Sequence, residues 1–128
     1  TDSALAVFRG LFDLSLFVDL HRVPELVCGF TRRPAEGPTL YPVACAPQSW
    51  AAAAVYMLLQ SSLGLVVRAP QRQVVFERAL LPDFLPWVRI TNLQVGNASI
   101  DLLLERHELD VGIRVLRRSG DVQIVAIK

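Results

Sequence analysis

The spacing of hydrophobic residues divides the chain into a helical part and a strand-forming part, with the boundary close to Gly64. Residues 3–20 carry leucine and phenylalanine at intervals of three and four, which predicts a helix. Residues 48–63 predict a second helix, because Pro47 suits a first helical turn and Gly64 provides a C-terminal stop. Between them, residues 21–46 are interrupted by prolines and glycines, so neither a helix nor a long strand can persist there.

After Gly64 the pattern becomes that of strands. Apolar and polar positions alternate from Ile100 to Leu104, as expected for a sheet with one buried face. Gly96 and Gly120 fall at turns between the later strands. We therefore expect a small antiparallel meander or half-sandwich built from residues 65–67, 73–77, 88–91, 93–95, 98–105, 111–116 and 122–127.

These patterns predict the α+β class, with N-terminal helices followed by a small antiparallel β-sheet extension. The predicted division is residues 1–64 for the helices and their loop and residues 65–128 for the β-rich part. The connection 80–87 is expected to place Phe84 and Trp87 in the core of the sheet.

Composition narrows the function classes. The chain has 128 residues, which is the length of one domain. Because 52% of its residues are hydrophobic, the chain would collapse, and this excludes a disordered protein. With 13 basic against 12 acidic residues, it has no general attraction for nucleic acid or for an anionic membrane. Charged residues or prolines interrupt nearly every apolar run, and the longest clean stretch, residues 49–67, contains Gln60 and Gly64. This stretch predicts a buried helix running into a strand, not a membrane span.

No metal or cofactor is expected. Cys28 and Cys45 lie 17 residues apart, without the close spacing of a structural zinc site, and the chain has only two histidines. We therefore expect Cys28 and Cys45 to be buried thiols.

The proline-rich loop is where chemistry would concentrate, because loops held between helices commonly carry binding and catalysis. Aromatic rings stack on the apolar face of a sugar while charged groups bind its hydroxyls. The alternative is a solvated connector with aromatic anchors. The loop and the start of the second helix together hold Arg22, Glu25, Phe30, Arg32, Arg33, Glu36, Tyr41 and Trp50.

Two runs carry a resemblance to a known family. PELVCGF at residues 24–30 is followed by GPTLYPVACAPQSWAAAAVYMLLQSSLGL at residues 37–65. Together they resemble the closing segment of the catalytic domain in bacterial glycogen-debranching-enzyme-like proteins, the amylo-α-1,6-glucosidase group; Ser49 stands where that group usually has alanine. LPDFLPWVRITNLQVGNASIDL and VLRRSGDVQIV resemble the β-rich extension of the same group.

The resemblance implies a piece of a larger enzyme: the last helices of a toroid of six α-helical hairpins, with its C-terminal extension. Such enzymes hydrolyse α-glucosidic bonds with inversion, using one carboxylic acid and one carboxylate. Glu25 matches the position of the general base, and the partner acid would lie outside this chain. The resemblance also implies a cytoplasmic protein that acts on an α-glucan or oligosaccharide and a chain that is inactive alone.

Further residues are candidates for substrate binding. Arg22 would orient the Glu25 carboxylate or pair with it, or it would have a structural role. Tyr41 and Trp50 would line the sugar-binding end, although Trp50 at a first helical turn suits a core position equally well. Gln48 would reach a sugar hydroxyl or cap the helix. Glu36, beside two arginines, is expected to form a solvated surface pair.

Two other interpretations remain open. One is a non-catalytic module that binds carbohydrate, and the other is a structural or interaction module. The first predicted helix is apolar around more than one face, as expected when neighbours lie on both sides. We therefore expect the isolated chain to self-associate through exposed helix faces, or to pack its helices onto its own sheet.

Overall fold

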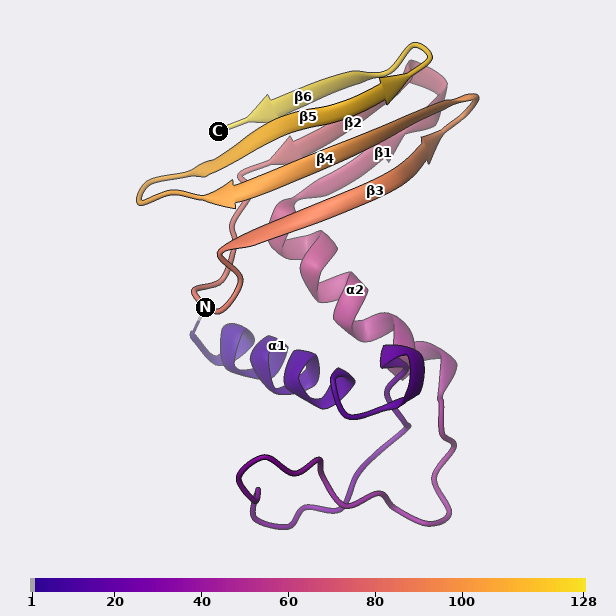
Figure 1. The fold of residues 1–128 in the computed structure, drawn as a ribbon, viewed down its shortest axis with the longest axis vertical. Helices are drawn as coiled ribbons and strands as arrows, with labels where there is room; N and C mark the ends of the chain where they lie inside the picture. Colours follow the sequence, from indigo (N-terminus) through magenta and orange to yellow (C-terminus); the bar gives the residue numbers. More distant parts are fainter. Residues whose placement is uncertain (1) are drawn as a thin grey trace. The chain divides into compact units, whose positions relative to one another are not determined.

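The structure is a computed structural model that describes residues 2–128 (Figure 1). Two helices precede a set of strands, so the predicted α+β class is confirmed. The chain forms two compact units, one ending at Leu58 and the other running from Leu59 to Lys128. We refer to them as the helical unit and the sheet unit.

The helical unit begins with α1 (Asp2–Ser15), which is shorter than the predicted helix 3–20. After Ser15 the helix tightens into a turn, in which the N–H of Leu16 bonds the carbonyl of Asp13 at 3.2 Å. Leu20 and His21 then adopt left-handed backbone angles, with φ of 53° and 57°, so the chain does not resume the helix. The Nδ1 atom of His21 lies 3.0 Å from the carbonyl oxygen of Ser15, at the end of the helix. A short 3-10 turn, η1 (Asp19–His21), follows.

Residues 22–48 then form the loop that the prolines predict (Figure 1). Its two sides touch at an isolated bridge between Val27 and Leu40, next to a hydrogen bond of 2.9 Å from the backbone N–H of Cys28 to the carbonyl of Thr39. The second helix, α2 (Ser49–Leu63), agrees with its prediction within one residue at the start.

Gly64 ends α2, as predicted, with φ of 54°. A Cβ atom at this position would lie 1.9 Å from the carbonyl oxygen of Glu77, so the neighbouring strand also requires glycine here. The helix therefore ends where the chain passes directly into the first strand, β1 (Leu65–Arg68).

The sheet unit contains two three-stranded sheets, where the sequence predicted an antiparallel meander or half-sandwich. Its elements are β1 (Leu65–Arg68), the 3-10 turn η2 (Ala69–Gln71), β2 (Gln73–Glu77), β3 (Trp87–Val95), β4 (Ala98–Arg106), β5 (Val111–Ser119) and β6 (Gln123–Ile127). The order is β1-β2-β6 in one sheet and β3-β4-β5 in the other, and all pairs are antiparallel except β2 with β6, which is parallel. The chain changes sheets after β5, and the N–H of Gln123 then bonds the carbonyl of Arg72 at 2.8 Å to start the new pairing.

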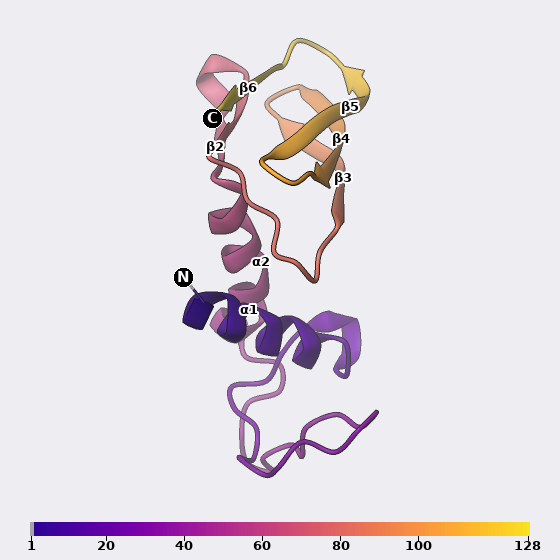
Figure 2. The ribbon, with the colours of Figure 1, turned by 90° about the vertical axis from the view of Figure 1, so that its left-hand side faces the viewer.

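Both sheets contribute to one hydrophobic core, which lies between them (Figure 2). The predicted alternation on β4 is confirmed, because every second side chain from Ala98 onward is buried. The buried cluster consists of Leu63, Val74, Phe76, Leu81, Val95, Ala98, Ile100, Leu102, Leu104 and Val122.

The predicted core position of Trp87 is wrong, since 59% of this residue is exposed. In β3 the inward positions are Val88 and Ile90, which pack against the core, so the pleat turns Trp87 outward. Leu81 enters the core from the same connection, and Phe84 is half-buried.

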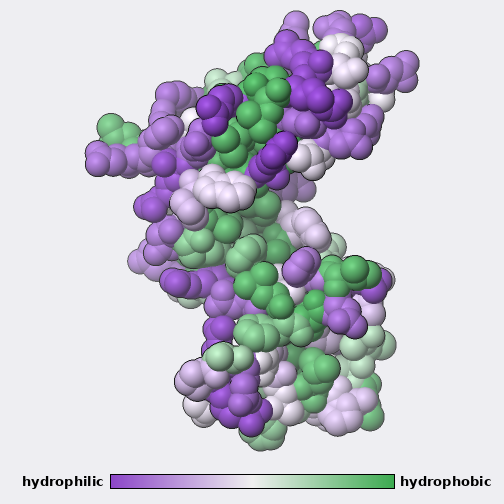
Figure 3. All heavy atoms as spheres, in the orientation of Figure 1, coloured by the Kyte–Doolittle hydropathy of each residue, from purple (hydrophilic) through white to green (hydrophobic). Residues whose placement is uncertain are grey.

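The helical unit has little core of its own. Among its described residues, Phe8 and Val23 are the large apolar side chains that are fully buried, and many others are exposed. Figure 3 shows apolar residues at the surface of this part of the chain. Within residues 2–128, neither helix combines the length and the apolar character that crossing a membrane requires.

Candidate functional site

The loop brings two segments of candidate residues side by side. The backbone N–H of Glu25 donates to the carbonyl of Cys45 at 2.9 Å, and the N–H of Gln48 donates to the carbonyl of Val23 at 3.3 Å. Val23 and the following Pro24 are buried and anchor the first segment. The structure therefore places the backbone of Glu25 and that of Gln48 on adjacent stretches of the loop.

The Glu25 carboxylate is held by this pairing. Its Oε2 atom accepts a hydrogen bond of 3.3 Å from the backbone N–H of Cys45, so the residue is bonded to Cys45 through both backbone and side chain. The side chain is nevertheless exposed. Because an ionised carboxylate has acceptor capacity for several hydrogen bonds, Glu25 can be oriented by Cys45 and still bind water.

Gln48 and Arg22 flank this carboxylate in the two segments. The carbonyl of Gln48 accepts the first backbone bond of α2, from Ala52 at 2.8 Å, so its backbone occupies the cap position. The Gln48 side chain is half-buried, and both of its predicted roles stay predictions. Arg22 is exposed, and no hydrogen bond or ion pair of residues 2–128 joins it to Glu25.

Tyr41 and Trp50 are exposed side chains of the helical unit. Tyr41 is exposed and starts a turn closed by a hydrogen bond of 3.1 Å from the N–H of Ala44 to its carbonyl. Trp50 is 73% exposed, which rules out the core alternative for this residue. The structure thus leaves both rings available for contacts.

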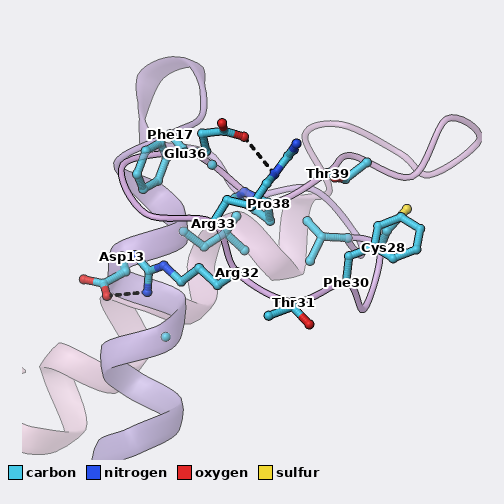
Figure 4. A pocket seen from close by; sticks show the side chains of 14 residues that line it. Asp13, Phe17, Cys28, Phe30, Thr31, Arg32, Arg33, Glu36, Pro38 and Thr39 are labelled. Atoms are coloured by element: carbon cyan, nitrogen blue, oxygen red, sulfur yellow. Dashed lines mark hydrogen bonds and ion pairs between the residues drawn. The ribbon is translucent and has the colours of Figure 1, made fainter.

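A second cluster, which the five candidate residues did not include, forms a pocket of about 220 Å³ between one face of α1 and the loop (Figure 4). Two ion pairs lie at its rim. Arg32 approaches Asp13 at 3.1 Å, and Arg33 approaches Glu36 at 2.8 Å. The expected surface pair of Glu36 with a neighbouring arginine is therefore confirmed.

The remaining lining of this pocket is largely apolar and includes Leu14, Phe17 and Phe30. Each charge at the rim has an opposite partner, so the pocket suits a small, uncharged, amphipathic ligand. A sequence signal for it exists, because Gly10, Asp13, Leu14 and Phe17 follow the three- and four-residue spacing of one helix face.

The cysteines differ from their prediction. Cys45 is exposed, and Cys28 is only half-buried with its Sγ 3.6 Å from the carbonyl of Leu40. The loop provides too little apolar cover to bury either thiol fully. Within residues 2–128, no group of three histidine, cysteine or acidic side chains is arranged to hold a metal ion.

Perturbed ionisation occurs in the sheet unit, away from the predicted site residues. The Arg117 side chain donates to Asp101 at 3.0 and 3.1 Å, and this bond lowers the pKa of the Asp101 carboxyl, assisted by the backbone N–H of Asn92. The same pair raises the pKa of Arg117. The bond from Lys128 likewise lowers the pKa of Asp110. Each of these shifts follows from an ion pair within the sheet unit.

A scan of protein-family models, a search of curated proteins and a search of solved structures each found no match to this chain. The motif resemblance in the loop and in the strands therefore stays a prediction. The geometry of Glu25 and of the surrounding loop is the observation on which a function can be proposed.

Proposed function

We propose that this chain is the C-terminal portion of a glycoside hydrolase that cleaves α-glucosidic linkages, the α-1,6 branch linkages of glycogen-like glucans, by an inverting two-carboxylate mechanism. The observation that carries the proposal is the Glu25 carboxylate, which is exposed and oriented by the backbone N–H of Cys45. This carboxylate lies in the PELVCGF run and is bonded to the YPVACAPQSW run. We place the enzyme in the cytoplasm and expect the isolated chain to be inactive.

In this mechanism Glu25 is the general base. An ionised carboxylate must accept a proton from the attacking water, with the acid's carboxyl about 6.5–9.5 Å away. The bond from the backbone N–H of Cys45 orients the Glu25 carboxylate for this role. Gln48, on the adjacent segment, is the proposed contact for a sugar hydroxyl, with Arg22, Tyr41 and Trp50 as further contacts.

The substitution Glu25→Gln in the hydrolase that contains this chain tests the proposal. The amide oxygen of glutamine can still accept the bond from Cys45, so the side chain keeps its orientation and loses its basicity. We expect kcat to fall by about 10²–10⁴ with KM little changed. Glu36→Gln is the matched control, because it removes the same charge from the same loop and should leave kcat within about twofold.

Two results would contradict the assignment of Glu25. One is hydrolysis of branched oligosaccharide by the Glu25→Gln enzyme at more than a tenth of the original kcat. The other is an equal loss in both variants, which would indicate a general effect of charge on the loop. Calorimetric titration of the chain alone with panose should show weak binding or none.

A second candidate function is a non-catalytic contact of the sheet unit with carbohydrate, and the exposure of Trp87 favours it. The register pairs Trp87 with Glu105 and Arg89 with Leu103, so these four residues share the outer face of β3-β4-β5. An exposed indole beside charged side chains is suited to stacking on a sugar. Binding of maltose to the chain that disappears in Trp87→Ala and persists in Glu25→Gln would favour this function over the hydrolase.

A further inference from the structure

Helix α2 presents an uncharged face to solvent. None of its residues from Ser49 to Leu63 is charged. Trp50 is 73% exposed and Met57 62% exposed, and the small Ala53 between them is also exposed. A largely apolar helix is normally covered by neighbours, yet these three side chains are exposed, so this face lacks a partner within the helical unit.

The spacing of the exposed residues indicates what kind of partner fits. Trp50, Ala53 and Met57 are separated by three and four residues, which is the seam of a helix that packs lengthwise on another helix. The two large side chains flank a small one, so a second helix can approach closely at Ala53. The seam lacks any charge that would select an oppositely charged partner.

We propose that a second copy of this chain covers this face, with the two α2 helices antiparallel and crossing at Ala53. Trp50 and Met57 lie at similar distances on either side of Ala53 and Ala54, so a two-fold axis there places Trp50 of one copy against Met57 of the other. Each large side chain then fills the space beside the partner's alanine. This inference goes beyond the proposed hydrolase and does not depend on it.

The exposed area is sufficient for a weak dimer. At the exposures found, Trp50, Tyr56 and Met57 together present on the order of 400 Å² per copy. With the residues around them, two copies would bury about 1,000–1,200 Å² in total, at the lower limit of specific interfaces. We therefore expect a reversible dimer with a dissociation constant of about 1–100 µM. Because Trp50 is covered in this dimer, the same side chain cannot contact sugar at the same time.

Sedimentation equilibrium of the chain across this concentration range is the test. Met57→Glu places two carboxylates in the uncharged seam and should raise the dissociation constant at least tenfold. Leu109→Glu is the control, because Leu109 is a fully exposed apolar residue in the turn between β4 and β5, outside the seam, and this variant should dimerise as the original chain does. Circular dichroism of both variants shows whether α2 remains helical.

Ala53→Leu separates a specific crossing from indiscriminate hydrophobic association. Leucine favours helix and adds apolar surface, so indiscriminate association would become stronger. A close crossing would become weaker, and we expect at least a fivefold rise in the dissociation constant. A monomer throughout the range would overturn the second copy as occupant and would indicate a helical segment of another polypeptide. A tighter dimer in Ala53→Leu would overturn the antiparallel crossing.

Discussion

The inward and outward sides of β4 should differ sharply in their effect on stability, and two adjacent leucines test this. Leu102 is completely buried between the two sheets and pairs with Ile90 on one side and Val115 on the other. Leu103 has the same chemistry one position later and is half-buried on the outer face. Leu102→Ala and Leu103→Ala therefore remove the same three carbon groups from opposite faces of one strand.

The expected magnitudes follow from burial. Losing three buried carbon groups costs roughly 2.4 kcal/mol in transfer free energy at about 0.8 kcal/mol each. The cavity left between two packed sheets adds to this, so Leu102→Ala should lower the free energy of unfolding by about 3–4 kcal/mol. Leu103→Ala opens no enclosed cavity and should cost about 1 kcal/mol or less.

Urea unfolding followed by far-ultraviolet circular dichroism measures both variants. The midpoint of Leu102→Ala should fall far below that of Leu103→Ala, with similar slopes. Equal losses in the two variants would refute the two-sheet arrangement, because a single sheet with both faces solvated would treat the positions alike.

Two further predictions concern the sheet surface and the glycines. Because the Asp101 pKa lies below its ordinary value of 3.8, its pairing with Arg117 stabilises the fold above that pH, and the contribution is lost as the pH falls through the lowered pKa. Arg117→Gln should move the Asp101 pKa upward in a carbon-13 titration, and an unchanged pKa would contradict the pairing. Gly64→Ala should destabilise the fold by about 2–4 kcal/mol, since its Cβ would strike the Glu77 carbonyl at a left-handed φ. The control Gly10→Ala, in open space on α1, should stabilise by about 0.5–1 kcal/mol, and equal thermal shifts for the two would disprove the close approach at Gly64.

Most elements of the fold could be predicted from local pattern, while the pairing of the strands could not. The end of α2 at Gly64 and the buried alternation on β4 follow from residues close in sequence, and both are confirmed. The parallel pairing of β6 with β2 joins residues about fifty positions apart. A strand's alternation tells which side chains face inward, but it carries no information about which edge the strand will join.

For Trp87, the hydrophobicity of the side chain and the alternation of the strand predict opposite faces of the sheet. Its size suggested the core, yet Val88 and Ile90 already occupy the inward positions of β3. Period two then requires Trp87 to face outward, whatever its transfer free energy. The alternation within a strand therefore decides which face of the sheet a side chain occupies, even for a side chain as large as tryptophan.

The candidate site could be predicted only in part, for the same reason. The prolines indicated a loop and its motifs singled out Glu25, but the bond from Cys45 to the Glu25 carboxylate depends on a chain reversal that no periodicity encodes. The pocket beside α1 was missed because its polar residues come from two segments whose approach the sequence does not specify. Irregular backbone is placed by particular long-range hydrogen bonds, and these become visible only in three dimensions.

The distribution of buried side chains separates the part of the chain that provides stability from the part that carries the proposed chemistry. The sheet unit buries a cluster drawn from both sheets, whereas the described residues of the helical unit fully bury only Phe8 and Val23 among their large apolar side chains. So small a core cannot offset the conformational entropy of ordering that many residues. Helix α2 belongs to both parts of the chain, because Leu63 at its end is buried in the sheet core while Trp50 at its start is exposed. The loop that carries Glu25 is thus connected to the sheet core through α2, which is packed at Leu63 and exposed at Trp50. A partner on the exposed face of α2 would stabilise the start of this helix, where the loop joins it.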